Sequence, residues 1–268
     1  MRYRTLVAPL AVVVLATGGA LIAAAPKPSP ALLAAVKAPS RTPANVLRDA
    51  YRHPAETLAF FGVKPTDKVV EIWPAGGWYT EILVPYLAKG HYTAAAPSER
   101  ARAGIQRLMT ANAAVYGDVK FATFPGATAA DRVADGSVDV VLTFRNVHNW
   151  NGRENDQSQA AFDQMFAMLK PGGTLGVVEH RLPEDAKGIT EAKSGYVKRS
   201  SVIAYATKAG FRLAGESAIN ANPKDTHDYP KGVWTLPPNY AEADKDKAKY
   251  TAIGESDRMT IKFIKPKK

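Results

Sequence analysis

The chain has 268 residues, of which 46% are hydrophobic, 22% charged and 9% aromatic. Such fractions are typical of globular proteins and exclude a wholly disordered chain, a collagen and a coiled coil. The absence of cysteine excludes disulfides, thiolate metal sites and cysteine nucleophiles. The formal net charge of +10 is basic, but by itself it does not identify a partner.

The first 25 residues have the three parts of a secretory signal peptide. Arg2 and Arg4 precede an uncharged apolar stretch, 6–25, which ends in a run of alanines. We expect cleavage after Ala24 and export, most simply to the periplasm. The alternative is an uncleaved anchor, because about 20 apolar residues can span a bilayer. Contact with a membrane is expected only through this leader.

Residues 26–44 are rich in proline and alanine and contain no acidic residue. This composition predicts a semi-rigid linker. A helix is expected to begin directly after it, with Thr42 as the N-cap and Pro43 at the first helical position. We therefore expect the folded domain to span residues 45–268.

Strand-like and helix-like segments alternate along the rest of the chain. Runs made mainly of β-branched or apolar residues, such as 138–143, suit strands that are buried on both faces. The pattern predicts an α/β fold with a doubly wound, mostly parallel, seven-stranded sheet whose last two strands pair antiparallel at one edge. In chain order, the expected strands are 68–72, 92–95, 120–123, 138–143, 174–179, 211–216 and 259–264, and the expected helices are 79–89, 99–112, 156–169 and 200–209.

Residues 220–256 interrupt this alternation with prolines and aromatic residues but no clear strand. A segment of this length without secondary structure is longer than an ordinary loop. Two interpretations stay open. The segment is either a surface excursion packed by its own aromatic side chains or a lid over a binding pocket.

A strand that ends in an acid runs through a glycine-containing turn into a helix at 69–80, Val-Val-Glu-Ile-Trp-Pro-Ala-Gly-Gly-Trp-Tyr-Thr. This turn resembles motif I of the class I S-adenosylmethionine (SAM) methyltransferases. Three later segments resemble the same family in the expected order: 139–150 after the fourth strand, Leu-Lys-Pro-Gly-Gly at 169–173 and Ala-Gly-Phe at 209–211. The sequences of residues 71–80 and 144–150 also resemble an exported bacterial group of predicted methyltransferases.

The resemblance implies a Rossmann-like fold, SAM as the cofactor and a small-molecule acceptor. Trp73 and Ala75 replace the first two motif glycines, and the acid that usually binds the ribose after the second strand is missing. The Trp73 indole either obstructs the methionine moiety or offers an aromatic face to the sulfonium. Glu71 either orders the turn by accepting backbone N–H bonds or contacts a cofactor amine. The residues expected at the cofactor are Glu71, Trp73, Pro74, Ala75, Gly76 and Gly77, with Ser98 and Glu99 in place of the ribose acid.

The segment after the fourth strand supplies the candidate catalytic residues. Methyl transfer depends mainly on positioning and needs a base only where the acceptor must lose a proton. His148 is the candidate base, Asn146 is expected to orient the acceptor, and Arg145 is expected to bind an anionic one. A loop hydrogen bond for His148 and a surface ion pair for Arg145 are the alternatives. Further residues on the substrate side are expected at Glu179, His180 and Tyr196.

Other chemistries have weaker support. The metal-like cluster at 225–228 has no second histidine nearby, so no metal is expected. The sequence contains no G-x-S-x-G nucleophile elbow and no Gly-Lys-Ser/Thr phosphate loop. Net charge alone does not support a role with nucleic acid, and the oligomeric state stays open. The main rival to a methyltransferase is a non-catalytic binding protein with a remodelled cofactor turn. A hydrolase or lyase using His148 and the 179–180 pair is a third option.

Overall fold

The computed structural model describes residues 26–126, 130–152 and 155–267. The predicted leader, 1–25, lies outside the described residues. Within these described ranges, no helix is both long and apolar enough to cross a membrane.

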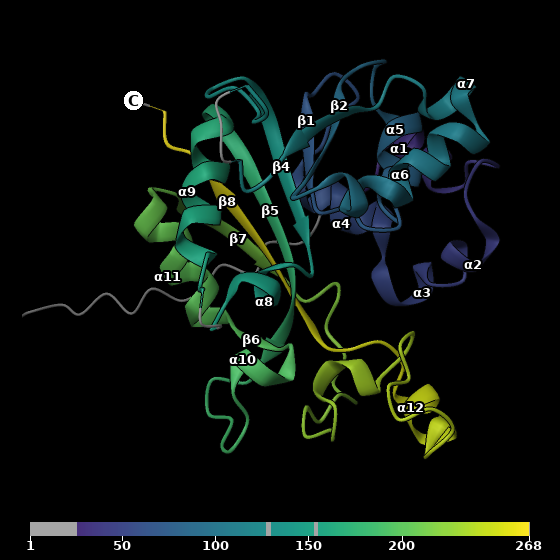
Figure 1. The fold of residues 1–268 in the computed structure, drawn as a ribbon, viewed down its shortest axis with the longest axis vertical. Helices are drawn as coiled ribbons and strands as arrows, with labels where there is room; N and C mark the ends of the chain where they lie inside the picture. Colours follow the sequence, from purple (N-terminus) through teal and green to yellow (C-terminus); the bar gives the residue numbers. More distant parts are fainter. Residues whose placement is uncertain (1–25, 127–129, 153–154, 268) are drawn as a thin grey trace, which may run out of the picture.

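A single central sheet organises the molecule (Figure 1). Its strands are β1 (Val69–Ile72), β2 (Tyr92–Ala96), β3 (Lys120–Thr123), β4 (Val138–Phe144), β5 (Leu169–Leu182), β6 (Val197–Lys198), β7 (Arg212–Ser217) and β8 (Arg258–Ile264). The strand order is β3-β2-β1-β4-β5-β8-β7, and the short β6 pairs with β5 outside this path. Strands β1 to β5 pair in parallel, whereas β8 is antiparallel to both β5 and β7. The predicted doubly wound, mostly parallel sheet is confirmed, and the reversed strand β8 lies one strand in from the edge.

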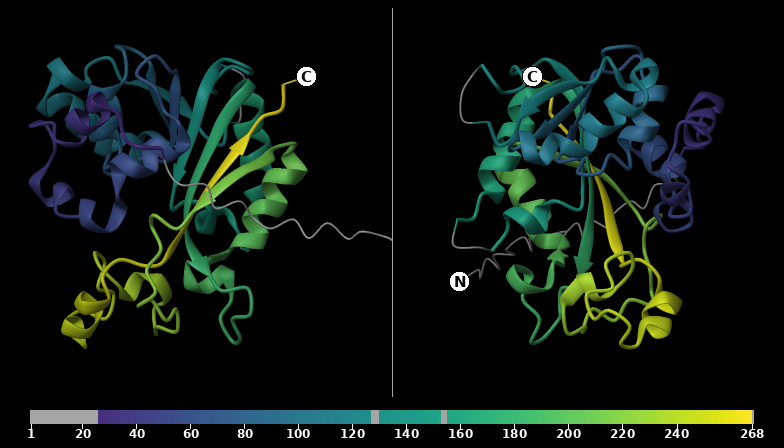
Figure 2. Two further views of the ribbon diagram at one scale, coloured as in Figure 1. Left: turned by 180° about the vertical axis from the view of Figure 1, so that it is seen from behind. Right: turned by 45° about the vertical axis from the view of Figure 1, so that its right-hand side comes forward.

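Helices cover both faces of this sheet (Figure 2). They are α1 (Pro30–Val36), α2 (Pro43–Val46), α3 (Asp49–Arg52), α4 (Pro54–Phe61), α5 (Thr80–Tyr86), α6 (Glu99–Ala111), α7 (Ala113–Tyr116), α8 (Val147–Trp150), α9 (Ser158–Met168), α10 (Glu191–Ser194), α11 (Arg199–Ala209), the 3-10 helix η1 (Gly232–Thr235) and α12 (Lys247–Ile253). Helices α1, α4, α5 and α6 share one apolar core with β1. Helices α9 and α11 share the other core with β4 and β5. The four helices expected from the sequence are confirmed as α5, α6, α9 and α11, with ends shifted by a few residues.

The prediction of a linker over 26–44 is wrong, because this segment contains helix α1 and the helix packs into the core. Leu32 and Ala35 lie three residues apart on one helix face, and both are buried in the core beside α5. The Ser29 hydroxyl accepts a hydrogen bond from the backbone N–H of Leu32 at 3.2 Å and caps the helix. The folded domain therefore includes residues before 45.

The expected helix start at Pro43 is confirmed as α2, with Thr42 at the N-cap position. The Thr42 hydroxyl does not cap this helix, however. It donates to the buried carboxylate of Glu81 on α5 at 2.6 Å, and the backbone N–H of Thr42 donates to the same group at 3.0 Å. This contact ties the N-terminal segment to the helix that follows β1.

The 220–256 insertion contains η1 and α12 and is packed by its own side chains. Tyr229, Leu236 and Tyr250 form a small buried cluster, as the first interpretation expected. The segment lies beyond the carboxyl ends of β4 and β5, at the bottom of Figure 1. Trp234 and the residues at 237–239 line a cavity there, so the insertion also supplies a wall. Its opening and closing as a lid stay a prediction.

Candidate active site

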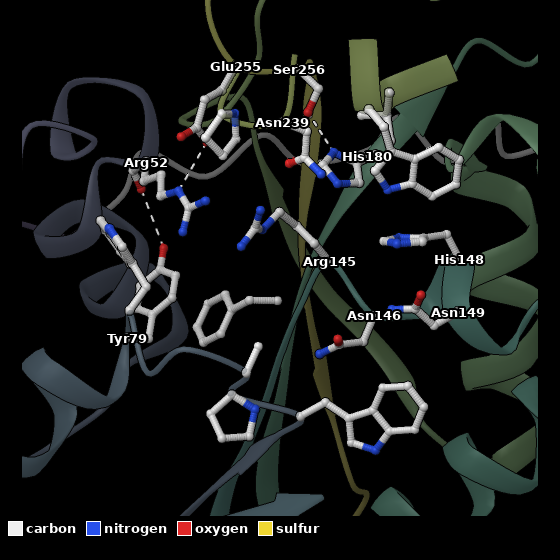
Figure 3. Close-up of a pocket in the computed structure, with 18 of the residues that line it drawn as sticks. Arg52, Tyr79, Arg145, Asn146, His148, Asn149, His180, Asn239, Glu255 and Ser256 are labelled. Carbon is white, nitrogen blue, oxygen red and sulfur yellow. Dashed lines mark hydrogen bonds and ion pairs between the residues drawn. The ribbon is translucent and has the colours of Figure 1, made fainter. Parts of the chain in front are cut away.

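A cavity of about 310 Å3 lies at the carboxyl ends of β1, β4 and β5 (Figure 3). Ligands of doubly wound folds bind at this edge of the sheet, and pockets for small molecules begin at about this volume. The predicted site residues that line the cavity are Glu71, Trp73, Pro74, Ala75, Arg145, Asn146, His148 and His180. Those that lie outside its lining are Gly76, Gly77, Ser98, Glu99, Glu179 and Tyr196. The structure thus brings together the turn after β1 and the segment after β4.

The turn after β1 has a glycine-like backbone at two positions that carry side chains. Trp73 has a φ of 47°, Ala75 a φ of 51° and Gly77 a φ of 84°. This left-handed region costs a residue with a side chain about 1–2 kcal/mol. The backbone N–H of Trp73 donates to the carbonyl of Ala95 at 2.8 Å, which fixes the turn to β2.

The Trp73 indole belongs to a residue that lines the cavity, and it is anchored at two points. Its Nε1–H donates to the carbonyl of Phe124, just after β3, at 2.8 Å. Its ring meets the Trp150 ring edge to face at 5.7 Å. Because β2 lies between β1 and β3, the indole reaches along the sheet edge from the end of β1 to the end of β3.

The two residues expected to replace the ribose acid do not reach the cavity. Ser98 is the N-cap of α6, and its hydroxyl accepts from the backbone N–H of Ala101 at 3.3 Å. Glu99, in the first turn of the same helix, is exposed. The prediction that they line the cofactor site is wrong for this arrangement, because α6 uses the first and directs the second to solvent.

Glu71 is buried at the end of β1 and bound by two hydroxyl groups. Its carboxylate accepts from the Tyr92 hydroxyl at 2.6 Å and from the Thr80 hydroxyl at 3.0 Å. The prediction that it orders the turn by accepting backbone N–H bonds is therefore wrong. Burial raises the pKa of Glu71 to about 7, although the hydrogen bonds from Tyr92 and Thr80 act in the opposite direction.

His148 and Glu179 form a histidine–carboxylate pair. Oε1 of the fully buried Glu179 lies 3.0 Å from His148 Nδ1, and its Oε2 accepts the backbone N–H groups of Val147 and His148 at 2.6 and 3.3 Å. A carboxylate on Nδ1 leaves Nε2 as the ring nitrogen that can take a proton. Figure 3 shows the ring directed into the cavity. Glu179 thus positions the histidine instead of touching a substrate.

His180 lies beside this pair, with its ring centre 5.3 Å from that of His148. Its Nδ1 lies 2.5 Å from the hydroxyl of Ser256, a residue that the sequence did not indicate. Burial, and then the charges of His148 and Arg145, hold the pKa of His180 well below its usual value. Tyr196 lies behind it, and its hydroxyl donates to the Asp225 carboxylate at 3.0 Å. The substrate-side prediction for Tyr196 is wrong, because that hydroxyl is buried and already bound.

Ring nitrogens and a carboxylate oxygen of His148, Glu179 and His180 lie within 4.8 Å of one another, close enough to hold a metal ion. The sequence suggested this grouping only for a hydrolase or lyase and not as a metal site. Glu179 Oε1, however, also accepts the backbone N–H of His180 at 2.8 Å. The positive charge of Arg145 acts on the imidazole of His180. A neighbouring guanidinium opposes a cation, so these surroundings favour a proton-handling group over a metal site.

The Asn146 side chain is hydrogen-bonded within the protein, whereas the Arg145 guanidinium forms no ion pair among the described residues. Asn146 Nδ2 donates to the carbonyl of Ile72 at 2.8 Å and lies 3.3 Å from Thr143 Oγ1. This amide joins the ends of β1 and β4, so its predicted role in orienting an acceptor is wrong for the NH2 group. Arg145, with a φ of 62°, is held by its backbone N–H on Val178. Among the described residues its guanidinium takes part in no ion pair, which argues against the surface-pair alternative.

An arginine cluster that the sequence did not indicate completes the cavity. Glu255, after α12, pairs with Arg48 at 2.6 Å and with Arg52 and Arg258 at 3.0 Å each. Burial alone would raise the pKa of Glu255, but these guanidinium groups lower it to about 2. More than 200 positions separate the two sides of this contact in the sequence, so no local motif could predict it.

Comparison with known proteins identifies the fold. No protein-family model matches the chain, and no curated protein matches it. The [4+2]-cyclase SpnF is similar with a TM-score of 0.59 and 16% identity, over 88% of this chain and 92% of SpnF. A SAM-dependent methyltransferase from Aquifex aeolicus is similar with a TM-score of 0.55 and 13% identity, over 86% of this chain and 96% of that protein. The chain has the class I methyltransferase fold. The trans-methyltransferase CalH, solved with S-adenosylhomocysteine, has a TM-score of 0.51 and 12% identity, over 82% of this chain and 58% of CalH.

The comparison confirms the predicted class I methyltransferase fold. At identities this low, the likeness establishes the fold, and the chemistry has to be argued from the site. Relative to this fold, the cavity includes the motif I turn and the loop after β4. It does not include the residues after β2 at 98–99.

Proposed function

We propose that this protein is a SAM-dependent methyltransferase that acts on a small molecule in the cell envelope. One observation carries the proposal: within the class I methyltransferase fold, a single cavity joins the motif I turn to the His148 ring. The envelope location rests on the signal peptide expected at 1–25. The similar Aquifex aeolicus protein and CalH, with its bound S-adenosylhomocysteine, support the choice of cofactor.

In this reaction the protein itself supplies a general base, His148, and the residue that positions it, Glu179. His148 Nε2 accepts the proton of an acceptor hydroxyl or amine, while Glu179 holds the other ring nitrogen and stabilises the imidazolium that forms. SAM supplies the methyl group when it is bound. The apolar rings of Trp234 and Phe144 on the cavity wall exclude water from the acceptor.

The residues present fit the amino-acid half of SAM better than the adenosyl half. The turn offers its backbone, and the space where a side chain of Gly76 would stand is open. The Trp73 indole runs along the sheet edge from the end of β1 to Phe124 after β3, and we expect it to compete with the adenosyl half for this edge. Turning the indole away breaks the bond to Phe124 and the edge contact with Trp150, which costs about 1–3 kcal/mol.

The same indole favours a second candidate, a non-catalytic binding protein that keeps the fold and has a remodelled cofactor turn. In that case Trp73 is a permanent part of the wall, and the cavity takes its ligand from the side of Arg145 and His148. SpnF, a [4+2]-cyclase, supports a wider choice, since a protein described by other chemistry has a similar fold.

Calorimetric titration with SAM and S-adenosylhomocysteine separates the candidates. The test compares the unchanged protein with Trp73→Gly, which removes the indole, and with Ala75→Gly, which relieves the other left-handed position but keeps the indole. A methyltransferase binds both ligands, and Trp73→Gly tightens binding by about 5- to 150-fold, whereas Ala75→Gly does not.

Binding by Trp73→Gly alone would favour the remodelled binding protein. No heat from the unchanged protein or from any variant would overturn the methyltransferase proposal. Thermal unfolding of each variant in the absence of ligand checks that it is folded.

A further inference from the structure

We propose that the cavity binds an oxyanion, the carboxylate or phosphate group of an otherwise apolar small molecule, between the guanidinium groups of Arg145 and Arg52. As a statement about the methyl acceptor, this inference rests on the proposed function. As a binding site, it rests on the cavity alone, and it is tested without SAM.

The first reason is the free guanidinium of Arg145. This side chain lines the cavity, and among the described residues no carboxylate pairs with it. Its backbone holds a strained left-handed conformation, with a φ of 62°, directly after β4. An arginine held in a strained backbone conformation, with no ion-pair partner in the protein, is suited to binding an anionic ligand.

The second reason is that Arg52 offers an unused donor to the same space. Its Nε is bound to Glu255 at 3.0 Å, its guanidinium lies 4.6 Å from the centre of the Trp78 ring, and its side chain is 2% exposed. Nη2 of Arg52 is buried and has no partner. A buried donor without a partner is costly. Figure 3 shows the Arg52 and Arg145 guanidinium groups turned towards each other across the cavity.

The third reason is the balance of charge. Four guanidinium groups, those of Arg48, Arg52, Arg145 and Arg258, surround the one carboxylate of Glu255, an excess of three positive charges. The nearby carboxylate of Glu179 is already bound to His148. Burial lowers the pKa of Arg145 to about 10, which reflects the cost of this charge in the absence of an anion. A bound oxyanion offsets that cost.

The chemistry of the walls indicates what carries the oxyanion. Guanidinium groups form paired hydrogen bonds with carboxylates and phosphates, a geometry that a single point charge does not provide. Beside them, the rings of Tyr79 and Phe144 stack with their centres 3.6 Å apart and line the cavity. A flat or apolar body fits against these rings, and the far side of the ligand then faces His148 (Figure 3).

Equilibrium binding of three matched probes tests the inference: benzoate, phenyl phosphate and the uncharged benzamide. Titrations are made by calorimetry at constant ionic strength, because charge–charge binding is sensitive to salt. We expect the two anions to bind and benzamide not to bind, and the tighter of the two anions identifies the head group. Equal binding of all three, or binding of none, would overturn the inference.

Two variants with the same change in charge show whether Arg145 is responsible. Arg145→Gln removes the free guanidinium, and Arg132→Gln removes an exposed one that pairs with Asp135 on the surface. We expect Arg145→Gln to weaken anion binding by about 10- to 100-fold and Arg132→Gln to leave it unchanged. Without ligand, Arg145→Gln is expected to raise the melting temperature, because it removes an unpaired half-buried charge.

Equal losses of affinity in both variants would overturn the inference. So would an Arg145→Gln protein that melts earlier and still binds the anions as before. Anion binding without SAM binding would leave this inference intact and count against the proposed function alone.

Discussion

Replacing Glu71 by glutamine tests the electrostatics at the end of β1. The Glu71 side chain is 3% exposed, and burial raises its pKa from the usual 4.5 to about 7. A carboxyl group with a raised pKa binds its proton more tightly in the folded protein than in the unfolded chain. Its contribution to stability is therefore fully present below pH 4.5 and is lost as the pH rises to about 7.

The size of the effect follows from the two pKa values. At about 1.36 kcal/mol per pH unit, a pKa of about 7 in place of 4.5 corresponds to about 3 kcal/mol. Glutamine has nearly the same shape and does not titrate. The free energy of unfolding of the unchanged protein should therefore fall relative to Glu71→Gln by about 3 kcal/mol between pH 4.5 and pH 7.

Urea unfolding, followed by tryptophan fluorescence from about pH 4 to pH 8, measures this difference directly. Glu56→Gln, on the exposed side of α4, is the matched control and should show no comparable change. A difference between Glu71→Gln and the unchanged protein that stays constant over this range, or that has the opposite sign, would refute the reasoning. It would mean that the hydroxyls of Tyr92 and Thr80 hold the ionised carboxylate as firmly as water does.

Two further predictions concern packing. Leu32→Ala should lower the free energy of unfolding by about 2–5 kcal/mol, measured by urea unfolding, because Leu32 is 1% exposed in the core. Leu33→Ala, next to it and 42% exposed, should change it by less than about 0.5 kcal/mol; equal effects would mean that α1 is not part of the core. Gly104→Ala should lower the melting temperature, because the added Cβ would lie 2.1 Å from the carbonyl oxygen of Ala75. Gly76→Ala has open space and should be tolerated; an equal loss there would contradict the close approach of α6 to the turn.

The sheet could be predicted because its signals are local. Runs such as 138–143 consist mainly of β-branched and apolar residues, and a strand buried on both faces needs little more. Helix α1 has no such local signal. Its proline and alanine content is also typical of a linker, and only contact with α5 and α4 distinguishes the two. The short helices α3, α7, α8 and α10 have four residues each, too few for a periodic pattern.

The candidate site was predictable where it follows strands. Residues directly after parallel strands meet at one edge of the sheet, and this rule correctly placed Trp73, Arg145 and His148 on the same cavity. It does not say which groups are already bound. The NH2 group of Asn146 and the hydroxyl of Tyr196 are held by partners that lie 74 and 29 positions away in the sequence. Glu255 lies even further in the sequence from its partners Arg48 and Arg52, and these contacts depend on how the insertion folds back onto the domain.

Backbone strain at residues that line the cavity indicates that their side chains contribute to binding. Trp73, Ala75 and Arg145 all line the cavity and all have positive φ, in the region where glycine carries no penalty. At about 1–2 kcal/mol each, these three positions take up a sizeable part of the roughly 5–15 kcal/mol that stabilises an ordinary domain. Glycine at 73 or 145 would relieve the strain but could neither bond to the Phe124 carbonyl nor place a charge in the cavity. The side chains at 73 and 145 therefore make contacts at the cavity that glycine could not make, which is expected of a built ligand site.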